Sequence, residues 1–150
     1  MAKQTASLKP SALSPLCINE SAPSGFTHVA VIEAADINNS AWTADGDTVE
    51  VPIFNATGKG VRAAMIVVDE AFVTDDALTA SVGSASDNDG VVAAQNVKVA
   101  GVKSPVAGFA PATAAAGVGE QLYVTFATAA SKGAPADIKT GRLRVFLQLV

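Results

Sequence analysis

The segment of residues 141–150, GRLRVFLQLV, constrains the fold more than any other part of the chain. Its apolar side chains recur at every second position, at Leu143, Val145, Leu147 and Leu149. A helix would repeat its buried face about every 3.6 residues, so this spacing predicts a β-strand with one face in an apolar core. We expect the strand to fix the C-terminal end in the body of the protein, so that long-range contacts come from the N-terminal residues or from loops.

Short strand-like segments recur along the chain, and no long helical period separates them. They lie at residues 28–33, 48–54, 61–73, 78–83 and 120–128, with 61–73 as the expected central strand. Residues 91–99 fit either a short strand or one or two helical turns. Pro52 lacks a backbone N–H and predicts an edge position or a β-bulge. The remaining stretches are expected to be irregular: 35–44, 84–90, 101–119 and 129–140. Brief strand pairing is expected within 101–119.

These segments predict one all-β domain over residues 27–150, an antiparallel β-sandwich that is jelly-roll-like or immunoglobulin-like. A length of 150 residues suits a single domain. Aromatic residues make up only 5% of the chain, so its apolar content consists mostly of small side chains. Such side chains suit close sheet packing better than a deep ligand pocket.

Residues 1–26 have no clear period and precede the body as an extended N-terminal arm. Prolines at positions 10, 15 and 23 exclude a continuous helix there. The arm is too apolar for a typical disordered tail, and its apolar anchors are Leu8, Leu13, Leu16 and Ile18. We therefore expect it to lie on a surface, either of its own body or of another subunit, with Lys3 and Lys9 contacting acidic groups.

The net charge of −4 is unevenly distributed along the chain. Residues 28–90 contain eleven acidic side chains against Lys59 and Arg62, a net charge of −9, whereas the remainder carries +5. Arg142 and Arg144 place positive charge on the outer face of the last strand, which predicts a subunit-contact surface. An ordinary acidic exterior is the alternative interpretation. Nucleic-acid binding is not expected, since no basic stripe is interleaved with aromatic residues.

The sequence provides few groups for catalysis, and we predict no enzyme and no cofactor. His28 is the only histidine and Cys17 the only cysteine, which argues against a two-histidine metal site and excludes an intrachain disulfide. A strand-end histidine and a buried apolar cysteine are their expected roles. The N-terminal residues lack the continuous apolar stretch of a signal peptide, and no membrane-spanning segment is visible.

Residues 87–90, DNDG, match part of a calcium-binding loop. With Gly90 at the sixth loop position, the first and twelfth ligands fall on Ala85 and Asn96, where carboxylates are required. We therefore predict a solvated turn and no metal site. An irregular cation site that uses Asp87 and Asp89 is the alternative.

Residues 28–150 resemble the small β-sandwich structural proteins of tailed-bacteriophage virions, which decorate or cement the capsid. The likeness lies in residues 63–72, in residues 77–95, and in the pair 122–128 and 140–147. The resemblance implies that this last pair forms adjacent strands. It also implies binding to the major capsid protein lattice as a trimer or dimer, at the surface of a virion assembled from chains made in the host cytoplasm, with no catalysis.

From its composition, the arm is expected to attach in a groove between capsid subunits. A receptor- or carbohydrate-binding module of a phage fibre or tail is the alternative function, with Trp42 as its best candidate contact. An enzyme such as a glycan depolymerase is a distant third. Its carboxylate pair would have to be Asp69 and Glu70 or a similar doublet, and strand neighbours point to opposite faces.

Overall fold

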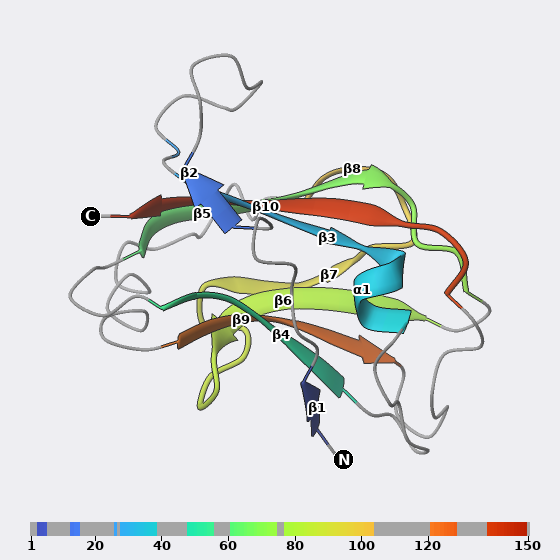
Figure 1. Ribbon diagram of the computed structural model, residues 1–150, viewed down its shortest axis with the longest axis horizontal. Helices are drawn as coiled ribbons and strands as arrows, with labels where there is room; N and C mark the ends of the chain where they lie inside the picture. The colour runs from blue at the N-terminus through green and yellow to red at the C-terminus, as the bar shows by residue number, and fades with distance from the viewer. Residues whose placement is uncertain are drawn as a thin grey trace.

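The computed structural model describes residues 3–5, 13–15, 26, 28–38, 48–55, 61–74, 77–103, 121–128 and 138–149. Two β-sheets pack face to face as a sandwich (Figure 1). Sheet A has the order β1 (Lys3–Thr5), β4 (Thr48–Asn55), β9 (Gln121–Thr128), β6 (Leu78–Ser84) and β7 (Val92–Asn96). Sheet B has the order β2 (Leu13–Pro15), β3 (His28–Glu33), β10 (Arg142–Leu149), β5 (Val61–Glu70) and β8 (Gly101–Lys103). The predicted all-β sandwich is confirmed.

Strand pairing is antiparallel throughout the body. Among the described strands, only β1 and β4 form a parallel pair. Strand β5 lies between β10 and β8, so the predicted strand at 61–73 is an interior strand over Val61–Glu70, whereas β10 lies at the centre of sheet B. The β4–β9 register shifts between Pro52 and Phe54, which fits the β-bulge alternative predicted from the proline. The edge alternative is wrong, because β4 lies between β1 and β9.

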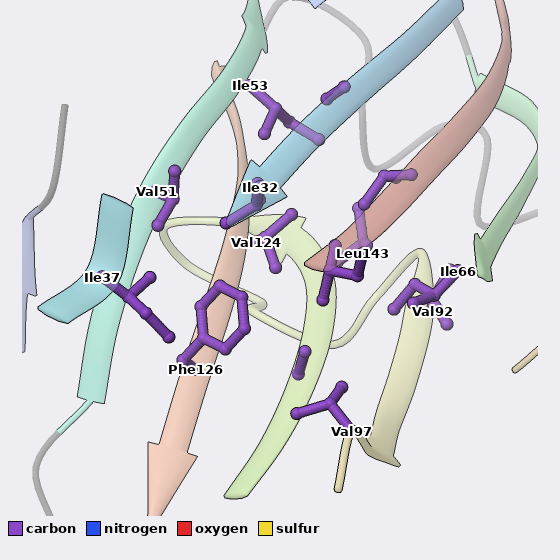
Figure 2. Close-up of a cluster of buried hydrophobic side chains, with 14 of the residues drawn as sticks. Ile32, Ile37, Val51, Ile53, Ile66, Val92, Val97, Val124, Phe126 and Leu143 are labelled. Atoms are coloured by element: carbon purple, nitrogen blue, oxygen red, sulfur yellow. The ribbon is translucent and has the colours of Figure 1, made fainter. Parts of the chain in front are cut away.

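The core lies between the inner faces of the two sheets. Leu143, Val145 and Leu147 of β10 have no exposed surface, as their period of two predicts. They face Val124 and Phe126 of β9 across the sandwich, and Figure 2 shows Phe126, Val124 and Leu143 pointing into the same cluster. The alternation of the sequence therefore places one whole side of each of these strands in the core.

Two sequence-based expectations need correction. Residues 35–44 were expected to be irregular, but a short helix, α1 (Ala34–Asn38), follows β3. The backbone N–H of Glu33 donates to Oδ2 of Asp36 at 2.8 Å, which is half of a capping box at the start of the helix. Ile37 is fully buried, so α1 is held by core packing as well as by its cap.

The second correction concerns the last two strands of the chain. The resemblance implies that residues 122–128 and 140–147 form adjacent strands, but β9 belongs to sheet A and β10 to sheet B. Strands that face each other across a core carry the same apolar alternation as strands that pair within one sheet. Their pattern therefore fixes which side of each strand is buried and not which strands are hydrogen-bonded. The undecided segment 91–99 forms the strand β7, followed by a bend.

The outer face of sheet A carries a buried polar row, in which Thr125 of β9 lies between Glu50 of β4 and Ser81 of β6. The hydroxyl of Ser81 donates to the backbone oxygen of Asn88 at 2.9 Å. The hydroxyl of Thr125, a residue only 2% exposed, has no hydrogen-bond partner in the part of the chain that the structure describes. One buried hydroxyl of this row is thus satisfied and its neighbour is not.

Replacing Thr125 by Val is expected to raise the free energy of unfolding by about 1 kcal/mol, because the substitution removes an unsatisfied buried hydroxyl and keeps the shape of the side chain. Ser81→Ala is the matched control and is expected to lower the free energy by about 1 kcal/mol, since it leaves the Asn88 oxygen without its donor. Urea denaturation of both variants measures the two changes. A Thr125→Val variant less stable than the parent protein would contradict this account of the row.

Candidate functional site

The outer face of sheet B is the strongest candidate for a binding surface. Strand register aligns two rows of side chains on it, one made of Val29, Phe146 and Met65 and the other of Val31, Arg144, Val67 and Val102. The outer face of a sandwich is normally polar. Here the outward positions of β3 and β5 are largely apolar, and β10 adds Phe146 among polar residues, so the outer side of sheet B is more apolar than is usual.

The first row forms a second apolar cluster, separate from the core. Val29, Met65 and Phe146 are 6%, 8% and 1% exposed, respectively. The ring of Phe26 packs against that of Phe146 with 6.0 Å between centroids and a 59° tilt. We call Val29, Met65 and Phe146 the outer cluster. It anchors the surrounding partly buried residues to the sheet.

Arg144 lies above the outer cluster and is held on two sides. Its Nε and one terminal nitrogen donate to the two carboxylate oxygens of Asp69, both at 2.8 Å. Its guanidinium carbon lies 5.0 Å from the centroid of the Phe146 ring. Bidentate pairing and stacking on a ring fix the orientation of an arginine better than either contact alone. Both side chains of the ion pair are more than a quarter exposed, so solvent screening limits its stabilisation to about 1 kcal/mol.

Arg142 lies beside the same carboxylate. The β10–β5 register shifts between Arg142 and Leu143, and this bulge places Asp69 next to both arginines. The Nε of Arg142 is 3.9 Å from Oδ2 of Asp69, and its side chain is 48% exposed. The structure therefore brings the two predicted basic residues together. Arg144 is neutralised within the chain, and Arg142 presents its charge to solvent.

A polar depression of about 380 Å³ adjoins Arg142 at this end of the sandwich. We call it the end cleft. Its charged lining consists of Glu33, Glu70, Lys139 and Arg142, and two alanines of α1, Thr140 and Gly141 complete it. Two acids and two bases side by side suit ion pairs with a partner surface, whereas sites for small apolar ligands have mostly hydrophobic walls.

Three large apolar residues of the described part are strongly exposed, one on β8, one before it and one after β5. Val102, 64% exposed, continues the second row on β8, and Val99, 54% exposed, precedes that strand. Val73, 50% exposed, exchanges backbone hydrogen bonds with Lys139 and Thr140 near the end cleft. Single exposed valines are common, but Val102 lies on the outer row and enlarges the surface available to a partner.

The predicted contact residues of the arm are only partly described. Lys3 lies in β1 opposite Thr48, and Leu13 lies in β2 opposite Ala30, so these parts of the arm pair with its own body. The remaining predicted contacts lie outside the described residues, as does the best candidate for carbohydrate binding: Leu8, Lys9, Leu16, Ile18 and Trp42. Sequence reasoning missed the outer cluster. Its signal was present in the apolar residues of β3, β5 and β10 at positions that alternate with the core residues.

The acidic turn after β6 is organised by its backbone. Asp87 accepts hydrogen bonds at its backbone oxygen from Ser84 N at 2.9 Å and from Gly90 N at 3.2 Å. A hydrogen bond to Asp89 raises the pKa of the Asp87 carboxyl, and desolvation and the charge of Asp89 raise it further. In the described ranges, no group of three or more His, Cys, Asp or Glu residues is arranged to hold a metal ion. Asp87 and Asp89 thus form a coupled acidic pair in this turn.

Asp87→Asn is expected to stabilise the protein at pH 7, because it removes the repulsion between the two carboxylates and keeps the turn. The raised pKa of Asp87 means that the folded state binds this proton more tightly than the unfolded state. The contribution of Asp87 to stability is therefore full below about pH 4 and is lost as pH rises through the raised pKa. In thermal melting from pH 3 to 7, the melting temperature of the variant should rise relative to that of the parent protein as pH rises. Asp69→Asn is the control and should lose stability at pH 7, since it breaks the pair with Arg144.

Comparisons with known proteins leave the class of the chain open. No family model matches the sequence, and neither a curated protein nor a solved structure matches it. Within the described residues, no helix is long and apolar enough to cross a membrane. A function must therefore be proposed from the fold and from the chemistry of the outer face and the end cleft.

Proposed function

We propose that the chain is a structural protein of a tailed-bacteriophage virion, which decorates or cements the capsid by binding the lattice of the major capsid protein. The observation that carries the proposal is the outer face of sheet B. Arginine is enriched in protein–protein interfaces, and this face presents Arg144 in one row with the exposed Val102. The resemblance of residues 28–150 to capsid decoration proteins suggests the partner.

The proposed contact has an apolar centre and a charged margin. Val31, Val67 and Val102 lie in one row with Arg144, and burial of their exposed area would provide the favourable free energy of binding. The end cleft would add ion pairs through Arg142, which is half-exposed. Charged groups at the margin of an interface mainly set specificity and the rate of association.

Binding of this kind stabilises a capsid by mass action. A protein that binds the assembled lattice and not its separated subunits shifts the equilibrium toward the lattice. At a free concentration about 100 times the dissociation constant, the gain is about 2.7 kcal/mol for each site. In this proposal the chain works as a trimer or dimer, so that several outer faces bind neighbouring capsid subunits at once.

The proposal is tested on particles purified from a lysate of cells that produce the phage encoding the chain. Quantitative mass spectrometry should find the chain in mature particles at a fixed ratio to the major capsid protein. Stripping the chain with mild denaturant should leave intact heads that rupture at a lower temperature, and adding it back should restore the original temperature. A chain that is missing from the particles, or that sediments with tails separated from heads, would refute capsid decoration.

A further inference from the structure

Both sheets are completed at one side of the sandwich by residues from the start of the chain. Strand β1 (Lys3–Thr5) is outermost in sheet A and pairs with β4, and β2 (Leu13–Pro15) is outermost in sheet B and pairs with β3 (Figure 1). The opposite side is closed differently, by β7 and β8 from the middle of the chain. One N-terminal segment thus covers two sheet edges.

The covered edges would otherwise be open to pairing. Strand β4 has eight residues and β3 has six, and each is hydrogen-bonded on its other side to a long strand of the body. An uncovered strand edge offers a row of unpaired N–H and C=O groups and readily accepts another strand. The body therefore has two sites for an added strand, and the two short strands of its own N-terminal segment occupy them.

The N-terminal strands are held by few pairings. Each has three residues, and β1 with β4 makes the one parallel pair among the described strands, which is the less stable arrangement for each residue. The other pairs have six to eight register partners, apart from the pairs of the edge strands β7 and β8, which have three each. Because β1 and β2 precede all the other described strands in the chain, both can leave the sheets without displacing a strand that lies between them and the body, which makes them the strands most easily exchanged.

We propose that this segment exchanges between copies of the chain, so that β1 and β2 of one copy pair with β4 and β3 of another. The occupant is a second copy because it carries the same two strands in the same register as those seen here. Exchanged pairs are chemically identical to internal ones, so concentration and the geometry of the connecting residues decide between them. Reciprocal exchange links two copies, and exchange in one direction around a ring links three.

This inference goes beyond the proposed function, because it concerns contacts between copies and requires no capsid. It also gives the predicted arm a role on the body as well as on a partner. A second copy is bound through the edges of both sheets, whereas the outer face of sheet B stays free for the lattice. The two proposals can therefore fail separately.

Mixing two singly substituted proteins tests the exchange. Ser14 and Val29 are register partners in the β2–β3 pair, and paired positions of this kind have Cα separations of about 4.5–5.5 Å, within reach of a disulfide. In a Cys17→Ser background, one full-length protein carries Ser14→Cys and the other Val29→Cys. The proteins are mixed at high concentration under mild oxidation, and non-reducing electrophoresis with peptide mass spectrometry identifies the disulfide between positions 14 and 29.

Exchange predicts at least tenfold more of this linked heterodimer than a control mixture of Ser14→Cys with Ala93→Cys, since Ala93 is exposed on the far edge strand β7. Equal amounts in the two mixtures would overturn the proposal. A single chain that carries both Ser14→Cys and Val29→Cys should form the disulfide at low concentration, and its failure to do so would also overturn the proposal, because β2 would not lie on β3.

A second pair reports on sheet A and guards against misfolding of the Val29 variant. Lys3 and Thr48 are register partners in the β1–β4 pair. Lys3→Cys mixed with Thr48→Cys should again give at least ten times more heterodimer than Lys3→Cys mixed with Ala93→Cys. If the mixtures for both sheets form no more heterodimer than their controls, although all variants melt at the temperature of the parent protein, the segment does not exchange between copies.

Discussion

Gly141→Ala is expected to destabilise the protein by about 3–5 kcal/mol, which is a large share of the total stability of a domain of this size. Gly141 has φ of +148°, a conformation that side chains with a Cβ rarely adopt. An added Cβ would overlap the ring of Phe72 and lie 2.9 Å from its Cα atom. Because Phe72 is a fully buried core residue, its ring has little room to move.

The position of Gly141 makes this clash affect the site as well as the fold. Its backbone oxygen accepts a hydrogen bond from Ala34 N at 2.8 Å, which connects the start of β10 to the first turn of α1. The residue also lines the end cleft. Displacing it would move Arg142, the next residue, relative to Glu33 across the cleft. A folded Gly141→Ala variant should therefore also bind the proposed partner less tightly.

Gly101→Ala is the matched control for this substitution. Gly101 has φ of +131°, so it shares the backbone strain, but an added Cβ there would have no atom within 4 Å. We expect the backbone strain alone to lower the free energy of unfolding of Gly101→Ala by about 1–3 kcal/mol. Urea denaturation of both variants separates the two contributions. Equal losses in the two variants would show that the contact with Phe72 is unimportant.

Phe126→Ala is expected to lower the free energy of unfolding by about 3–5 kcal/mol, because it empties the centre of the core. Phe126 has no exposed surface, and its ring contacts that of Phe72 with 5.8 Å between centroids. Its neighbours belong to both sheets, so they cannot close the cavity without moving one sheet toward the other (Figure 2).

The control for Phe126→Ala is Phe126→Leu, which keeps most of the apolar volume. Its free energy of unfolding should fall by clearly less than that of the alanine variant. Calorimetry or urea denaturation measures both variants. A loss of less than 1 kcal/mol for the alanine variant would mean that Phe126 does not join the two sheets. The assignment of β9 to the inner face of sheet A would then be wrong.

The strands of the body could be predicted from the sequence because their side chains alternate between water and the core. Residues 28–33 form β3 with the predicted bounds, and Leu122, Val124 and Phe126 of β9 are buried as their spacing indicates. The bulge at Pro52 was predictable for a local reason, the missing N–H. These features depend only on neighbouring residues.

Features that depend on distant residues could not be predicted in the same way. The alternation of β9 and β10 does not distinguish pairing within a sheet from facing across the core. The ion pair between Asp69 and Arg144 joins positions 75 residues apart, and it forms only because β5 and β10 are neighbours with a bulge between them. Phe146 is apolar at an outward position, but its partners Val29 and Met65 become visible only once three strands are aligned.

The proposal that the outer face of sheet B binds a capsid lattice is tested by rebinding to stripped heads with Val102→Glu. Val102 is 64% exposed on the outer row, so a charge there should leave the fold intact and weaken binding at least tenfold. Ala93→Glu, which places the same charge on the exposed edge strand β7, should bind as the parent protein does. Equal affinities for the Val102→Glu variant, the Ala93→Glu variant and the parent protein would contradict the claim.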